Sequence, residues 1–146
     1  MKIAFAIFFI ELICISLFSC SKFGEPDSSS RFLGTYMIRR NTQLMDPSTG
    51  NRFYVEDTII LTIGKSNTVS EIHLFGQDSC TAIFNKDKFV INLHATKRKY
   101  GDIIKQPYEV TGIGSFSGDS IFYTENLGSG SYFGLRGTSQ LIGVKQ

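Results

Sequence analysis

The chain has 146 residues, with 15 basic and 13 acidic side chains and a formal net charge of +2 at pH 7. This charge is too small to indicate a protein that binds nucleic acid, or one that is held to an anionic membrane by charge alone. The length is that of one domain, which can bury about two thirds of its unfolded surface without a disulfide or metal to staple it.

The first residues have the layout of a secretory signal peptide. Lys2 supplies the positive charge at the start, and an apolar run over residues 3–18 follows. This run is short for a transmembrane helix, which needs about 20 apolar residues. Glu11 interrupts the run, at a cost of about 2.5–3.5 kcal/mol for an acid at the centre of an inserted helix, and the surrounding Phe, Ile and Leu offset that cost. We predict a signal peptide over residues 1–19.

Leu17, Phe18, Ser19 and Cys20 resemble the lipobox of bacterial lipoproteins, with Phe18 where that family has a small or hydroxyl residue. The resemblance implies cleavage before Cys20 and lipidation of its thiol, so that a membrane is a partner through this anchor. Because Ser21 rather than Asp follows the cysteine, it also implies an outer membrane lipoprotein, in the cell envelope of a Gram-negative bacterium. An uncleaved N-terminal helix with a buried cysteine is the alternative.

Residues 20–30 are interpreted as the lipidated cysteine and a flexible tether, because they are rich in Ser, contain Gly and Pro, and have no apolar period. The domain then covers residues 31–146. Cys14 leaves with the signal peptide and Cys20 carries the lipid, so Cys80 has no intramolecular disulfide partner. We interpret Cys80 as a buried, inert thiol, with intermolecular pairing as the alternative.

After residue 30 no stretch has sustained helical apolar spacing, whereas β-branched and aromatic runs bounded by Gly, Asn, Asp and Ser predict strands. The predicted strands cover residues 32–40, 53–63, 68–75, 80–84, 89–96, 103–116, 121–126 and 131–138, the last one extending or restarting over 141–145. The clearest alternation lies in 89–96, where Phe89, Ile91, Leu93 and Ala95 share one face. His94 lies on the other, polar face, and we expect it to point to solvent.

Eight strands joined by hairpin-length links predict an all-β fold. An antiparallel up-and-down barrel is favoured because closure removes the free edges, and a two-sheet β-sandwich is the alternative. Pairing between the first and the last strand would distinguish the two. Gly112 and Gly114 alternate within the sixth predicted strand, which indicates a bend or the close approach of another element.

Three short blocks resemble small lipocalin-like bacterial lipoproteins. Residues 32–36 are similar to the Gly-x-Trp signature on the first strand of lipocalins, with Tyr36 in the Trp place. Residues 110–121 resemble the G-x-G … G-D-x-I hairpin of that group, and residues 137–138 and 143–145 resemble its final strand. The resemblance implies an eight-stranded calycin-type barrel, but no particular ligand, because many unrelated functions use this fold.

No catalytic or metal-binding pattern is visible in the sequence. His73 and His94 are the only histidines and lie on separate predicted strands, without the spacing of metal ligands. Nothing places Cys80 beside a histidine, as a Cys–His nucleophile would require. The basic run 97–99 lies between predicted strands and is interpreted as a solvated loop. We therefore predict no enzyme, no metal, no cofactor and no nucleic-acid partner.

The aromatic residues of the domain fit either an ordinary barrel core or a cavity for a small apolar ligand. The leading hypothesis is a membrane-anchored lipoprotein that binds such a ligand, and the alternative is a structural or protein-interaction lipoprotein with a filled barrel. The side chains that alternation predicts to face inward, and to line the ligand pocket, are Tyr36, Ile38, Ile59, Leu61, Ile91, Leu93, Tyr108 and Val110. A pocket of about 300 Å³ or more would support the ligand, and a filled interior would support the alternative.

Overall fold

The computed structural model describes residues 29–146, except for residues 69, 77, 104 and 130–133. The predicted signal peptide, Cys20 and residues 21–28 of the predicted tether lie outside the described residues. The last two residues of the predicted tether, Ser29 and Ser30, begin the folded domain. The Phe32 amide donates a hydrogen bond to the Ser29 carbonyl at 2.9 Å, within the short 3-10 helix η1 (Ser30–Phe32).

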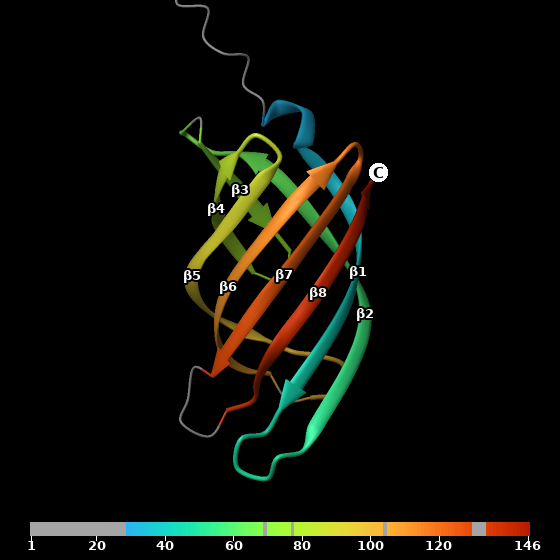
Figure 1. The fold of residues 1–146 in the computed structure, drawn as a ribbon, viewed down its shortest axis with the longest axis vertical. Coiled ribbons are helices and arrows are strands. Elements are labelled where there is room, and N and C mark those ends of the chain that lie inside the picture. The colour runs from blue at the N-terminus through green and yellow to red at the C-terminus, as the bar shows by residue number, and fades with distance from the viewer. Residues whose placement is uncertain (1–28, 69, 77, 104, 130–133) are drawn as a thin grey trace, which may run out of the picture.

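Eight antiparallel strands follow one another in chain order around a closed barrel (Figure 1). The strands are β1 (Gly34–Met45), β2 (Arg52–Lys65), β3 (Glu71–Phe75), β4 (Ser79–Asn85), β5 (Lys88–Arg98), β6 (Gln106–Ser117), β7 (Ser120–Ser129) and β8 (Arg136–Lys145). β1 pairs with β8 along its length, from Tyr36 opposite Lys145 to Met45 opposite Arg136, which closes the sheet. The predicted up-and-down barrel is confirmed and the β-sandwich is wrong. The architecture is consistent with a lipocalin-like fold.

Several predicted strand boundaries differ from the structure, and those of the first and last strand show why. β1 continues five residues beyond the predicted end at residue 40, because Thr42 and Leu44 extend its inward-facing series. The turn is therefore limited to the segment after Met45, where the Asp46 carboxylate accepts a hydrogen bond from the Ser48 amide at 2.8 Å. β8 is one strand from Arg136 to Lys145, and residues 134 and 135 before it are not in a strand. Residues 131–133 of the predicted strand lie outside the described residues.

Side-chain alternation places the core inside the barrel. In β1, Tyr36, Ile38, Arg40, Thr42 and Leu44 are buried, and the residues between them are exposed. This is the period of two that a strand with one solvated face requires. The interior thereby receives polar as well as apolar side chains from one strand.

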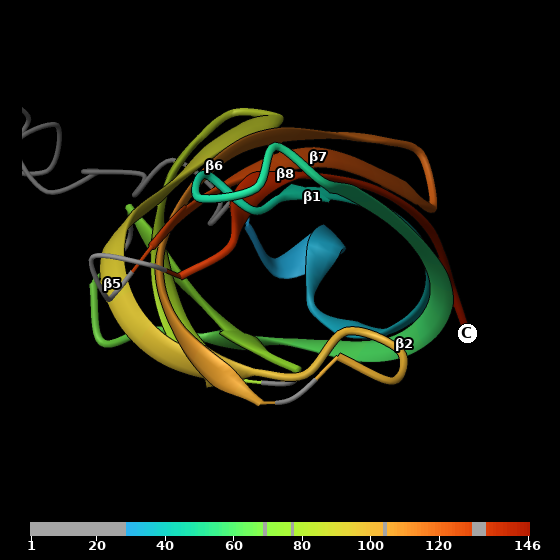
Figure 2. The same cartoon turned by 90° about the horizontal axis from the view of Figure 1, so that it is seen from below.

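A large apolar cluster fills the barrel at the end where η1 lies, hereafter the η1 end, and Figure 2 shows η1 inside the ring of strands. The Phe32 ring stacks on Phe116 with centroids 4.2 Å apart and meets Phe84 edge-on at 5.5 Å. The Tyr36 hydroxyl donates a hydrogen bond to the Phe32 carbonyl at 2.9 Å. These contacts seal the η1 end with aromatic side chains.

A second apolar cluster closes the opposite end, hereafter the far end. It comprises Leu44, Tyr100, Tyr108, Val110 and Leu127. Tyr100 does not belong to a strand but to the connection between β5 and β6. Its ring lies 5.5 Å from the ring of Tyr108, nearly perpendicular to it.

The connection that carries Tyr100 covers a part of the wall where strand pairing stops. β2 pairs with β3 only from Thr62 to Lys65, and β4 reaches β5 only up to Ile91. The rest of β2 and β5 therefore have no strand partner on that side among the described residues. In this region Val55 of β2 packs against the far-end cluster. The loop that leads into β4 lines the cavity next to it.

The close approach predicted at the two glycines of β6 is confirmed. A Cβ atom at Gly112 would lie 2.9 Å from the Thr124 carbonyl oxygen of β7. A Cβ atom at Gly114 would overlap the Phe89 ring and Tyr123. Both glycines therefore make room for neighbouring elements inside the tightly packed barrel.

Candidate functional site

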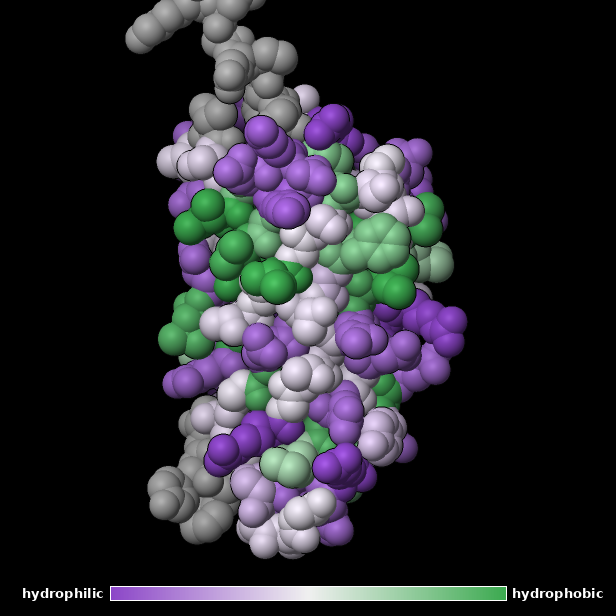
Figure 3. Space-filling model, viewed as in Figure 1, coloured by the Kyte–Doolittle hydropathy of each residue, from purple (hydrophilic) through white to green (hydrophobic). Residues whose placement is uncertain are grey.

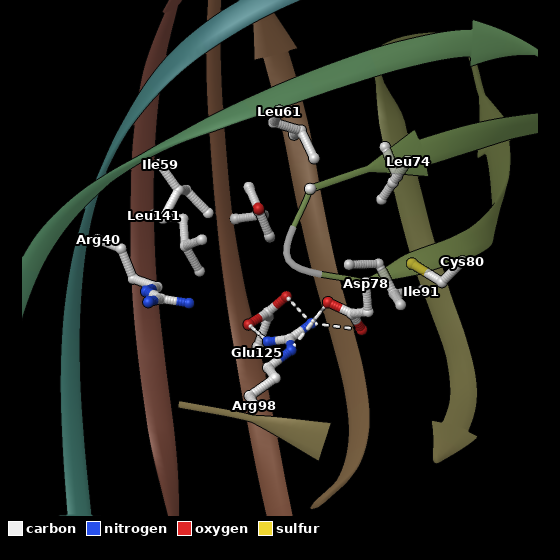
Figure 4. Close-up of a pocket in the computed structure, with 12 residues that line it drawn as sticks. Arg40, Ile59, Leu61, Leu74, Asp78, Cys80, Ile91, Arg98, Glu125 and Leu141 are labelled. Atoms are coloured by element: carbon white, nitrogen blue, oxygen red, sulfur yellow. Dashed lines mark hydrogen bonds and ion pairs between the residues drawn. The ribbon is translucent and has the colours of Figure 1, made fainter. Parts of the chain in front are cut away.

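A layer of charged side chains lies inside the barrel, between the two apolar clusters. Figure 4 shows Arg40, Asp78, Arg98 and Glu125 of this layer beside apolar side chains of the η1 end. We call this group the charged layer, and it comprises Arg40, Asp57, Asp78, His94, Arg98 and Glu125. Arg40, Arg98 and Glu125 are buried and the other three are partly buried. Charges at such depth need partners, because desolvation of an unpaired ion costs several kcal/mol.

Arg98, at the end of β5, is the centre of the charged layer. Its guanidinium binds both oxygens of Asp78, with Nε–Oδ1 and Nη2–Oδ2 distances of 2.9 Å. It also binds both oxygens of Glu125, at 2.5 and 3.2 Å, and donates to the Tyr100 hydroxyl at 3.2 Å. Burial alone would lower the pKa of Arg98, but the charge and hydrogen bonds of Glu125, with those of Asp78, raise it above its usual range. Arg98 is therefore a permanently charged bridge between two carboxylates.

Asp78 reaches the layer from the loop between β3 and β4. Besides Arg98, its carboxylate contacts His94, with a distance of 2.6 Å between His94 Nε2 and Asp78 Oδ2. The other ring nitrogen of His94 lies 3.1 Å from the Asn92 carbonyl. Burial would raise the pKa of Asp78, but hydrogen bonds and charge from Arg98 and His94 outweigh it and lower the pKa. The loop is thus tied to β5 through a carboxylate.

Arg40 forms a second ion pair in the layer, with Asp57 of the neighbouring strand β2. Its Nε donates to Asp57 Oδ1 at 2.8 Å, and its Nη2 contacts Asp57 Oδ2. The guanidinium also lies over the Tyr100 ring, 4.5 Å from the centroid. Tyr100 therefore touches both buried arginines and connects the charged layer to the far-end cluster.

Glu56 and Asp57 point to opposite faces of β2, as the strand geometry predicts. Glu56 faces outward and pairs with Arg39 at 2.5 Å, on the exposed surface of β1 and β2. Asp57 faces the interior and pairs with Arg40. The dipeptides Arg39-Arg40 of β1 and Glu56-Asp57 of β2 thus form one ion pair on each face of the sheet.

The cavity beside the charged layer has a volume of only about 20 Å³. It is lined by side chains from both the layer and the η1-end cluster, and includes Ile59, Leu61 and Ile91 from the predicted pocket set (Figure 4). One water molecule needs roughly 10–15 Å³ of such space, whereas pockets for drug-sized ligands have about 300–1,000 Å³. In the part of the chain that the structure describes, the space beside the charged layer is therefore filled by side chains.

Most of the side chains predicted to face inward do so. Tyr36, Ile38, Leu61, Ile91, Tyr108 and Val110 are buried, and Ile59 is partly buried against the η1-end cluster. They do not converge on one pocket, because Tyr108 and Val110 belong to the far-end cluster and the others to the η1 end. Leu93 is the exception, since 67% of it is exposed, and its predicted inward position is wrong.

A register irregularity in β5 explains the error at Leu93. The pairing of β5 with β6 shifts between Ile91 and His94, so the strict alternation is interrupted there. After this bulge His94 and Arg98 point inward, and Leu93 points out. The prediction that His94 faces solvent is therefore wrong. The prediction of a solvated loop over residues 97–99 is wrong for Arg98, which is buried at the end of β5.

Sequence reasoning missed the carboxylates and arginines of the charged layer. A signal was present for three of them. Arg40 follows Ile38 in β1, Asp57 is in phase with Ile59 and Leu61 in β2, and Glu125 continues the inward series Ile121, Tyr123 in β7. For Asp78 and Arg98 the sequence offers no such signal. One lies in a loop, and the other follows the bulge.

Cys80 packs partly buried against the η1-end cluster, and burial raises the pKa of its thiol to about 12. It is therefore protonated near neutral pH and a poor nucleophile. Among the residues that the structure describes, no three His, Cys, Asp or Glu side chains are grouped as metal ligands. Within the same residues, no helix is long and apolar enough to cross a membrane.

No family model, no curated protein and no solved structure matches this chain. The class of protein is therefore defined by its architecture alone, as an all-β protein with a closed, eight-stranded, up-and-down barrel.

Proposed function

We propose that this protein is an exported envelope lipoprotein, anchored through Cys20 in the outer membrane of a Gram-negative bacterium, whose barrel serves as a rigid interaction module. The observation that carries the second half of this proposal is the interior cavity of about 20 Å³. Among the described residues, a cavity of this size beside the charged layer has no room for a small apolar ligand, so we assign the contacts with partners to the surface of the barrel.

The charged layer supports a structural role for the interior. Its two arginines are bonded to three carboxylates, and these bonds connect β1, β2, β5, β7 and the β3–β4 loop. Because the charged groups are engaged with one another, a ligand would have to break buried ion pairs to bind there. The same engagement, with the protonated thiol of Cys80, favours a non-enzymatic protein.

The sequence supports the anchor, through the signal-peptide layout and the lipobox-like residues that end at Cys20. Ser29 enters the fold at the η1 end of the barrel (Figure 1). Residues 21–28 span at most about 30 Å at roughly 3.3–3.6 Å per residue. An anchor on Cys20 would therefore keep the η1 end close to the membrane.

Native mass spectrometry of the chain, extracted from the membranes of an expressing Gram-negative host, tests both halves of the proposal. We expect a mass that starts at an acylated Cys20, and no further small molecule bound. A titration with the apolar probe N-phenyl-1-naphthylamine should show no saturable binding. A co-purifying apolar molecule held at one per chain would instead support the ligand-binding hypothesis, and a chain that retains Met1 would contradict the anchor.

A further inference from the structure

An apolar belt runs around most of the outside of the barrel in its η1 half. Every strand contributes an exposed large apolar side chain, and together these are Met37, Ile60, Phe75, Ile83, Val90, Ile113, Phe122, Ile142 and Val144. In Figure 3, apolar residues cross the visible face as a band, with hydrophilic residues above and below it. Apolar residues scattered singly on a surface need no explanation, but contiguous ones mark interaction sites.

Strand pairing shows that these residues are contiguous. Met37 lies opposite Ile60 on one side and opposite Val144 on the other. Two residues along β8, Ile142 lies opposite Phe122. Side chains directly opposite on one face of a sheet are about 4.5–5.5 Å apart at Cβ, so these five form one patch across β2, β1, β8 and β7.

The patch continues around the barrel. Phe122 lies opposite Ser115 of β6, and Ile113 is two residues from Ser115 on the same strand. Ile113 lies opposite Val90 of β5, and Val90 lies opposite Ile83 of β4. Phe75 then lies opposite Thr62, two residues from Ile60. Where the series moves along a strand before it crosses to the next one, it moves toward the far end. Strands in a closed barrel are tilted and staggered, and these moves offset the stagger. The series therefore runs at nearly constant height from Ile83 of β4 around the barrel to Ile60 of β2. It is interrupted at β3, where Ile83 lies opposite Glu71 and Phe75 stands four residues further along the strand.

The belt does not fit a lipid bilayer. A membrane-spanning barrel has an apolar band about 25 Å tall, whereas most strands here contribute one side chain to the belt, and strands rise by only about 3.3 Å per residue. Charged residues lie on both sides of it. Lys88 is on the η1 side, and the exposed Arg39–Glu56 ion pair is on the far side.

We propose that copies of this chain associate side by side through the apolar belt, when they are anchored on the same membrane. This inference rests on the proposed anchor on Cys20. Because every chain leaves the barrel at the η1 end and the tether spans at most about 30 Å, copies on one membrane stand with that end toward it. Their belts then lie at similar heights. Confinement to the membrane raises the effective concentration, so modest apolar contacts suffice.

The apolar belt suits a second copy for two further reasons. It covers every side of the barrel except the β3–β4 face, so two copies can meet in many rotations about the barrel axis. The groove between Val90, Ile113, Phe122 and Ile142, of about 630 Å³, gives protruding apolar side chains of a neighbour a place to insert. With a net charge of only +2, copies do not repel each other strongly.

Disulfide cross-linking of the full, lipidated chain in its membrane tests the proposal. In a Cys80→Ser background, Ile113→Cys places a thiol in the belt. The matched control, Asn126→Cys, places one on the outer face of β7, nearer the far end. After mild oxidation with copper–phenanthroline we expect cross-linked dimers with Ile113→Cys and only collisional background with Asn126→Cys. Equal yields at every surface density would overturn the proposal.

A second substitution tests the apolar contact itself. Adding Phe122→Glu to the Ile113→Cys chain should reduce the association constant about tenfold or more, the effect of losing one buried aromatic contact. Adding Asn126→Glu should leave the dimer yield unchanged. Circular dichroism confirms that each variant folds, and Ile142→Glu replaces Phe122→Glu if the latter does not. A yield that neither belt substitution reduces would contradict the belt.

Intact-mass measurement of the N-terminus shows whether Cys20 is acylated, and so distinguishes failure of the proposed anchor from failure of the belt. If Cys20 carries no acyl chain, the anchor fails, and the belt is tested by sedimentation of the full chain in solution. Oligomers that Phe122→Glu dissociates would then support the belt, and a monomer at all concentrations would overturn it.

Discussion

Arg98 of β5 and Glu125 of β7 meet inside the barrel, with 2.5 Å between Nη1 and Oε2, although β6 lies between the two strands. The pair therefore connects strands that share no backbone hydrogen bonds. Through its bonds to Asp78, Arg98 also fixes the loop between β3 and β4, where the strands are short. The charged layer thus holds together the part of the wall that strand pairing leaves incomplete.

Removing the carboxylate of this pair should be costly. We expect Glu125→Gln to lower the free energy of unfolding by about 3 kcal/mol, because a buried guanidinium then loses one of its two counter-charges. The matched control is Glu56→Gln, which breaks the exposed pair with Arg39 and should cost about 0–1 kcal/mol. Urea unfolding followed by circular dichroism measures both. Equal costs would show that the interior pair is not buried as described.

The stability of the protein should fall in acid partly through Asp78. The folded-state pKa of Asp78 is lowered, so its contribution is fully present above the usual Asp pKa of about 3.9 and is lost as the pH falls below that value toward the folded pKa. We expect Asp78→Asn to be less stable than wild type at pH 7, and to lose less stability between pH 7 and pH 3. Urea unfolding at both pH values measures this difference, and parallel losses in the two proteins would contradict it.

The filled interior should resist even one added methyl group. We expect Gly114→Ala to lower the free energy of unfolding by about 1–3 kcal/mol, because its Cβ would overlap Phe89 and Tyr123. The control is Gly76→Ala, whose Cβ would lie at an ordinary 3.4 Å from Leu61. Thermal melting of both variants provides the measurement. A Gly114→Ala protein as stable as the control would indicate free space beside the two aromatic rings.

The fold was predictable because strand alternation and turn residues are local signals. The closure of β1 on β8 followed from the number of strands and from the need to remove edges. The charged layer was predictable only in part. Arg40 and Glu125 keep the inward phase of their strands, whereas the bulge before His94 reverses the phase of β5 for Leu93 and Arg98. A bulge depends on pairing with a distant strand, and one sequence does not contain that information.

Acylation should depend on one cysteine. We expect Cys20→Ser to abolish both acylation and the cleavage before residue 20, so that the chain keeps residues 1–19 and carries no acyl mass. Cys80→Ser is the control, since that side chain packs against the η1-end cluster, and it should remain in the membrane fraction. Fractionation and intact-mass measurement of both variants give the answer. Cleavage of Cys20→Ser at the same position as wild type, or an unchanged mass at the N-terminus, would exclude lipidation of Cys20 as the anchor.

The bulge in β5 predicts opposite behaviour for two apolar residues of the same strand. Ile91 precedes the bulge, is buried and lines the small cavity, so Ile91→Ala should lower the free energy of unfolding by about 2–4 kcal/mol. Leu93 faces outward, and Leu93→Ala should change stability by less than about 0.5 kcal/mol. Unbroken alternation would instead make the two substitutions equally costly. Urea unfolding of the two variants under one set of conditions therefore decides between the bulge and regular alternation, and so determines whether His94 and Arg98 reach the charged layer.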